Sequence, residues 1–69
     1  MSENTYRVVE IVGTSTTGID DAITNAIERA SETLENLDWF EVTQNRGHIE
    51  NGAVAHFQVY LKVGFKLIS

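Results

Sequence analysis

Residues 54–68 read VAHFQVYLKVGFKLI, and apolar side chains alternate with polar ones along this stretch. A period of two is typical of a β-strand with one buried face. The odd-numbered positions from Phe57 to Leu67 are all apolar, so we expect them to face a core. The pair Asn51-Gly52 just before the strand suits a tight type I′ turn, which predicts an antiparallel hairpin with the preceding residues.

The other strand of the predicted hairpin runs from Trp39 to about Ile49. Its alternation places Phe40 and Val42 on the core face and Trp39 on the opposite face. Gly47 lies inside this strand and predicts a β-bulge, which would change the pairing register on one side of it.

Trp39 is the only tryptophan of the chain, and on a non-core face it needs a cover. Pairing outward from the turn puts it on the same face as Gln58, Tyr60 and Lys62. This face is too aromatic for a plain solvent surface and too polar for a core. The pattern supports burial of Trp39 in a subunit interface and stacking of Trp39 on a flat ligand equally.

A strand and a helix precede the hairpin. Residues 6–12 are rich in β-branched types, and residues 13–18 are turn formers. A helix is expected from about Ile19 to about Asn36, because apolar residues recur every three or four positions. These positions are Ile19, Ile23, Ala26, Ile27, Ala30, Leu34 and Leu37. The predicted fold class is therefore α+β, in the order β-α-β-β, with one helix against a three-stranded antiparallel sheet.

The chain of 69 residues is expected to form one domain, residues 1–69, with a small core. Below about 70–80 residues one core rarely contributes more than about 3–5 kcal/mol, so natural domains add disulfides, a metal or oligomerisation. The chain has no cysteine and only two histidines, His48 and His56. We therefore expect no metal site, and we expect a homo-oligomer.

The charge and hydropathy patterns argue against several partners. The net charge is -5 and the basic residues are scattered, which is unsuited to a nucleic acid or an anionic membrane surface. No apolar run approaches the roughly 18 residues that span a bilayer, and the polar start does not resemble a signal peptide. We expect a cytoplasmic protein.

No catalytic constellation stands out in the sequence. Gly13-Thr14-Ser15 follows a strand, but it lacks the glycine and lysine spacing of a phosphate-binding loop. The serines, histidines and carboxylates show no spacing that selects a nucleophile with its base. We therefore predict that the protein is not an enzyme and has no catalytic residues.

Several separate segments resemble the dodecin family, in the family's order. They are VEIVGTS (9–15), LENLDWFEV (34–42), RGHI (46–49), AHFQV (55–59) and KVGF (62–65), so the likeness extends from about Tyr6 to Leu67. The resemblance implies a helix partly wrapped by a three-stranded sheet and a hollow dodecameric assembly. It also implies flavin binding without catalysis, with FMN as the ligand, or riboflavin or FAD in its place.

The resemblance also implies roles for individual residues. In dodecins a tryptophan at the position of Trp39 stacks on the isoalloxazine ring, and two flavins lie together between symmetry-related tryptophans. A glutamine at the position of Gln58 hydrogen-bonds the ring edge. Residues at the positions of Asp38 and Arg46 line the flavin site, and the basic residue Arg7 is similar to one placed near it.

Some members of the family bind coenzyme A at a separate site between subunits. The residues here that match its contacts are Arg29, Thr33 and Lys66. Glu35 stands where some members carry a basic residue, and its charge would repel the phosphates of coenzyme A.

Two functions from different classes follow. The first is a flavin storage and buffering protein that protects against flavin photochemistry, because a tryptophan in contact with an excited flavin quenches it by electron transfer. The alternative is a structural or protein-interaction oligomer in which Trp39 is an interface packing residue and no ligand binds. A flavin enzyme is disfavoured, because no acid or base is predicted beside the ring.

Overall fold

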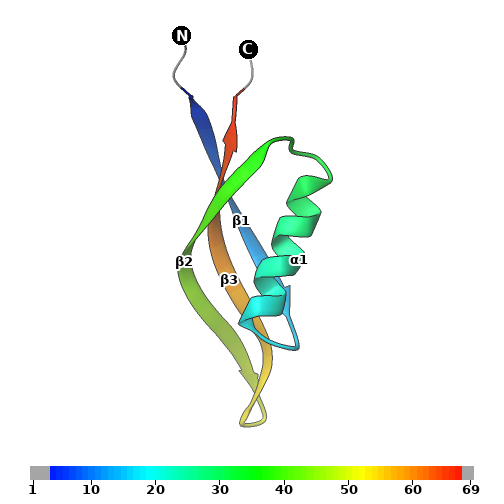
Figure 1. Ribbon diagram of the computed structural model, residues 1–69. Coiled ribbons are helices and arrows are strands. Elements are labelled where there is room, and N and C mark those ends of the chain that lie inside the picture. The colour runs from blue at the N-terminus through cyan, green and yellow to red at the C-terminus, as the bar shows by residue number, and fades with distance from the viewer. Residues whose placement is uncertain (1–3, 68–69) are drawn as a thin grey trace.

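The computed structural model describes residues 4–67, and its elements are β1 (Tyr6–Ser15), α1 (Ile19–Ser31), β2 (Leu37–Glu50) and β3 (Ala53–Lys66). The strands form one antiparallel sheet in the order β1-β3-β2, so the last strand lies in the middle (Figure 1). The predicted β-α-β-β order and antiparallel sheet are confirmed. Ile68, the predicted end of the last strand, lies outside the described residues, as do residues 1–3 and 69 of the predicted domain.

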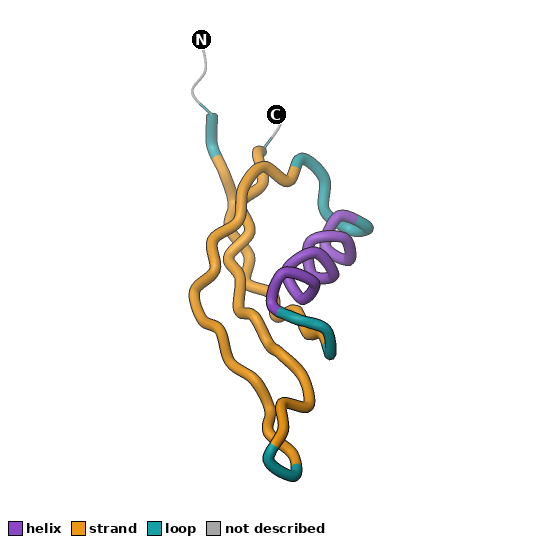
Figure 2. The backbone as a smooth tube through the Cα atoms, turned by 60° about the horizontal axis from the view of Figure 1, so that its bottom comes forward, coloured by secondary structure: helices purple, strands orange, loops and turns teal. Residues whose placement is uncertain are grey.

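The hairpin turn forms where the sequence predicts it. Asn51 has a φ of 53° and Gly52 a φ of 76°. A type I′ turn requires a positive φ at both central residues, and asparagine and glycine adopt it at the least cost. Beyond the turn β2 and β3, which are 14 residues long each, pair along most of their length, and Figure 2 shows this hairpin continuing well past the helix.

The β2–β3 ladder is irregular at Asp38, Thr43 and Ala55, and the bulge expected at Gly47 is wrong. Gly47 pairs directly with Phe57. A glycine does not need a bulge when its backbone is that of an ordinary strand, and Gly47 has no positive φ. Thr43 and Ala55 are extra residues on opposite strands, so their shifts cancel. Residues 39–42 therefore have the partners in β3 that counting outward from the turn predicts.

The helix is shorter than predicted and buries only part of the predicted apolar stripe. It ends at Ser31 rather than near Asn36, which has a φ of 65° and so lies outside the conformation of a right-handed helix. Its buried residues are a line of alanines, Ala22, Ala26 and Ala30, and Ala22 was absent from the predicted apolar stripe. The isoleucines of that stripe flank the alanine line and are only partly covered or exposed.

Small side chains bring α1 close to β1. Gly13 faces the helix, and a Cβ atom at this position would lie 2.7 Å from the Cβ of Ala26 and closer still to the carbonyl oxygen of Ala22. The helix therefore packs on the bare backbone of the strand at this point. The buried core between the helix and the sheet is small and consists of Ala22 and Ala26 of α1 and Val59, Leu61 and Val63 of β3.

The helix packs on β1 and β3 and leaves the helix side of β2 uncovered. Phe40 and Val42 lie on the helix side of the sheet, as predicted, but they are 48% and 36% exposed. A helix of 13 residues is about 20 Å long, whereas a strand of 14 residues extends over roughly 46 Å. The expectation that these two residues belong to the core of the chain is therefore wrong.

Candidate ligand-binding site

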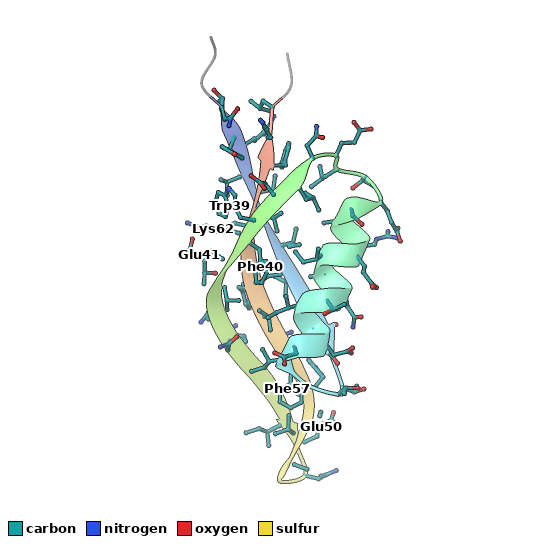
Figure 3. The ribbon with its side chains drawn as sticks, viewed as in Figure 1. Trp39, Phe40, Glu41, Glu50, Phe57 and Lys62 are labelled. Atoms are coloured by element: carbon teal, nitrogen blue, oxygen red, sulfur yellow. The ribbon has the colours of Figure 1, made fainter. Side chains whose placement is uncertain are left out.

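The candidate site lies on the sheet surface turned away from α1, which we call the outer face. It consists of alternate side chains from Tyr6 to Thr14 on β1 and from His56 to Lys66 on β3. On β2 it includes Trp39 and Glu41 before the irregularity at Thr43, and Gln44, Arg46 and His48 after it. In Figure 3 Trp39, Glu41 and Lys62 point away from the helix, whereas Phe40 lies on the helix side. The predicted placement of Trp39 away from the core is confirmed.

Trp39 lies flat across the middle strand near one end of the outer face. It pairs with Gly64 of β3, and the indole atoms Cε2, Cζ2 and Nε1 lie directly over the position where Gly64 lacks a side chain. The residue remains 41% exposed. Val8 of β1 pairs with Gly64 from the other side, so it shares the row with the indole. One face of the indole therefore rests on the sheet and the other is accessible.

Gln58 belongs to a second group farther along the same face. It pairs with Arg46 on β2 and with Thr14 on β1. The guanidinium carbon of Arg46 lies 5.2 Å from the ring centroid of Tyr60, and its Nη1 donates to the Tyr60 hydroxyl at 3.4 Å. This contact holds the cation over an aromatic ring, from which its other donors can reach a phosphate or carbonyl oxygen.

The two groups are far apart within one chain. Gln58 and Gly64, which Trp39 covers, are six positions apart in β3, or roughly 20 Å along the strand. One of the two intervening rows is charged, because Lys62 pairs with Glu10 on one side and with Glu41 on the other. The structure therefore places both predicted flavin residues on one face, but one chain cannot bring both to the same three-ring ligand.

Asp38 joins the group at the Trp39 end. It lies in the irregular pairing at the start of β2 and accepts a hydrogen bond from the hydroxyl of Tyr6. This hydrogen bond raises the pKa of Tyr6 above its ordinary value of 10.0, and desolvation and the charge of Asp38 act in the same direction.

We expect Tyr6 to ionise at a higher pH than an ordinary tyrosine. Its pKa is raised in the folded state, so the Tyr6–Asp38 contact should contribute to stability below about pH 10 and be lost as the pH rises through the raised pKa. Tyrosinate absorbance, measured during a titration of the native protein and of Tyr6→Phe, assigns the steps. The variant Asp38→Asn should bring the Tyr6 step back toward its ordinary pH, and an unchanged step in that variant would contradict the assignment.

Arg7 does not join either group. It pairs with Phe65 and alternates with Val9 and Ile11, which pack against the core, so it lies on the helix side of β1. Within one chain the structure therefore separates Arg7 from Trp39.

The residues expected to contact coenzyme A are also divided. Arg29 and Thr33 line a groove of about 700 Å³ between α1 and β1. Lys66 lies instead at the end of β3, where it pairs with Tyr6 on the outer face. Arg29 forms an exposed ion pair with Glu32, with 3.0 Å between Nη1 and Oε1.

Gly64 is the site residue that the sequence reasoning missed. The available signal was a glycine inside an otherwise regular strand pattern, where it weakens the strand and marks a close approach of another group. Within residues 4–67 no helix is long and apolar enough to cross a membrane. The same residues contain no group of three or more His, Cys, Asp or Glu side chains that could hold a metal ion.

Comparison with known proteins gives one consistent family. Residues 5–68 match the family model for Dodecin. A dodecin of Thermus thermophilus is 52% identical over 62 residues, which cover 90% of each chain. The structure of dodecin from Streptomyces coelicolor has a TM-score of 0.94 at 64% identity and covers 100% of this chain and 99% of that one.

A more distant relative has calcium in its name. Calcium dodecin of Mycobacterium tuberculosis is 26% identical over 62 residues, which cover 90% of this chain and 87% of the relative. Its crystal structure, which is that of a calcium-chelating antigen with a novel calcium-binding site, has a TM-score of 0.80 and covers 93% and 91% of the two chains.

Proposed function

This chain belongs to the dodecin family, and we propose that it binds FMN without catalysis, storing the flavin and protecting it from photochemistry. The observation that carries the proposal is the flat, 41% exposed indole of Trp39 on a strand surface without a side chain beneath it. A planar ligand can cover such a ring completely on its free side. Riboflavin and FAD carry the same ring and are the related ligands.

The chemistry of the two rings supports both storage and protection. Indole is electron-rich and isoalloxazine is electron-poor, so offset stacking between them is favourable. An indole in van der Waals contact can also donate an electron to the excited flavin and return it to the ground state without photochemistry. Binding and quenching then have one structural cause.

Gln58 and Arg46 supply the polar part of the proposed site. A glutamine amide has both a donor and an acceptor, which match the alternating carbonyl and N–H groups at the edge of the flavin ring. Arg46, held over Tyr60, is suited to a ring oxygen or to the phosphate of FMN. Because these residues lie roughly 20 Å from the indole in one chain, the proposed site combines residues of at least two chains.

The fold supports the assembly that such a site needs. Members of the dodecin family form homo-oligomers, and here the helix side of β2 exposes Phe40 and Val42. Phe40 lies beside Ile23 and Ile27 of α1. A second copy covering this surface would supplement the small core of the chain. We propose the hollow dodecamer of the family, with two flavins between symmetry-related tryptophans.

A second ligand is supported by the groove between α1 and β1. Arg29 and Thr33 line it together, so a phosphate of coenzyme A could bind there by displacing Glu32 from Arg29. Calcium is not proposed, because residues 4–67 contain no group of three or more candidate metal-binding side chains.

Titration of FMN with the purified native protein tests the proposal. We expect flavin fluorescence to fall to a plateau, and the flavin absorbance to co-migrate with an oligomer whose native mass corresponds to many chains. Undiminished fluorescence at saturating protein would contradict flavin binding. A stable oligomer that takes up no FMN would support the alternative, in which Trp39 only packs between subunits.

A further inference from the structure

We infer that Gly64 is a positioning residue for the flavin site, because its missing side chain sets the orientation in which Trp39 can stack on a ligand. The inference rests on the proposed flavin binding and identifies the residue that determines how the Trp39 ring is oriented for it. Gly64 need not touch the ligand.

The backbone of Gly64 does not itself require glycine. Gly64 lies inside β3 and pairs with β1 and β2, and among the described glycines only Gly52 has a φ in the left-handed region. Glycine in the interior of a strand loses more conformational entropy on folding than other residues and offers no side chain to pack. A central strand therefore carries an unfavourable residue at a position where any residue could adopt the backbone conformation.

The close approach of the Trp39 indole accounts for the glycine. A Cβ atom at position 64 would lie 2.6 Å from Nε1 of Trp39 and closer still to Cε2 and Cζ2. All three separations are below the 3.0 Å that real Cβ contacts essentially never show. Reaching an ordinary contact of about 3.5 Å would require the ring to move by ~1 Å or to tilt away from the strand.

The orientation of the ring matters because stacking needs a free, accessible ring face. With glycine beneath it, the indole spans β3 in the row of Val8 and presents its other face outward. A methyl group at position 64 would raise the ring, so the spacing available to a flavin held by a second subunit would shrink. Two stacked flavins between two tryptophans would experience this displacement twice.

Gly64→Ala tests this inference, and Gly18→Ala is the matched control. Gly18 has an extended backbone with a φ of 173°, and a Cβ atom added to it would have no other atom within 4 Å, so it accepts alanine without a steric clash. We expect Gly64→Ala to weaken FMN binding by about tenfold or more and to reduce the quenching at saturation. Gly18→Ala should bind and quench like the native protein.

The ligand-free protein gives a readout that does not depend on flavin. Displacement of the indole should change the near-ultraviolet circular dichroism and the emission of Trp39 in Gly64→Ala and leave both unchanged in Gly18→Ala. Trp39→Phe, whose single ring lacks the fused part of the indole that includes Cε2, Cζ2 and Nε1, should relieve the loss of thermal stability caused by Gly64→Ala. If glycine were required only by the backbone, the phenylalanine would bring no relief.

The possible results separate the inference from the proposed function. A native protein that takes up no FMN would contradict the proposed function, and an altered indole signal in Gly64→Ala would still support the positioning of Trp39. Unchanged indole spectra in Gly64→Ala would overturn the inference whether or not FMN binds. Native affinity and quenching in Gly64→Ala would overturn it as well.

Discussion

Replacement of Trp39 by alanine is expected to remove most of the quenching of FMN and to weaken FMN binding by about 10- to 100-fold. Stacking of a planar heterocycle on an aromatic side chain contributes about 1–3 kcal/mol as measured by alanine substitution, and 1.4 kcal/mol corresponds to a factor of ten in affinity. The indole here is only half covered by its own chain, so its free face is available to the ligand. Fluorescence titration of FMN with each protein measures both effects.

Trp39→Phe is the matched control, because it keeps an aromatic ring on the outer face and removes the electron-rich indole. It should retain part of the affinity and lose more of the quenching than of the binding. Native mass measurements on both variants distinguish the two proposed roles of Trp39. Dissociation of the Trp39→Ala oligomer, together with no FMN uptake by the native protein, would favour the packing role.

The face of Trp39 was predictable because local chemistry determines it. Asn51 and Gly52 define a type I′ turn, and a turn of known length sets which residues of the two strands share a face. The unforeseen shifts at Thr43 and Ala55 happened to cancel before the pairing reached Trp39. The predicted face of Trp39 is therefore correct, although the predicted position of the bulge was wrong.

The exposure of β2 was not predictable from the same pattern. The alternation of apolar and polar residues predicts which side of the sheet a residue faces, but its burial depends on where the helix lies over that sheet. α1 packs closely on β1 and β3 because the buried alanines from Ala22 to Ala30 and Gly13 are small. Phe40 on β2 is therefore left uncovered. This close packing is a tertiary property that no single segment reveals.

The composition of the site could be predicted only in part. Trp39 and Gln58 do share a face, but parity says nothing about the distance along the strand between them. Arg7 was not placed correctly by the family resemblance, which associates it with the flavin. Its strand register puts it on the helix side of the sheet, opposite to Trp39. Such residues can meet only through contacts between chains, which the sequence of one chain does not describe.

A mixture of Trp39→Ala chains and Gln58→Ala chains, unfolded and reassembled together, is expected to bind more FMN than either variant alone. Trp39 covers Gly64, and Gln58 lies roughly 20 Å farther along β3, so a ring that contacts both must take them from different chains. In an equal, random mixture about a quarter of such two-chain sites receive a native tryptophan from one chain and a native glutamine from the other. FMN uptake is measured at a concentration that leaves the sites of each single variant mostly empty.

The same two substitutions placed in one chain provide the control for this mixture. When the double variant Trp39→Ala/Gln58→Ala is reassembled with native chains, a site built from two chains is again intact in about a quarter of cases, whereas a site within one chain would be intact in about half. Equal FMN uptake by the two mixtures therefore supports a site shared between chains. Uptake by the control mixture alone would show that one chain supplies both residues, and the extended β3 strand would then have to bend far from its present conformation.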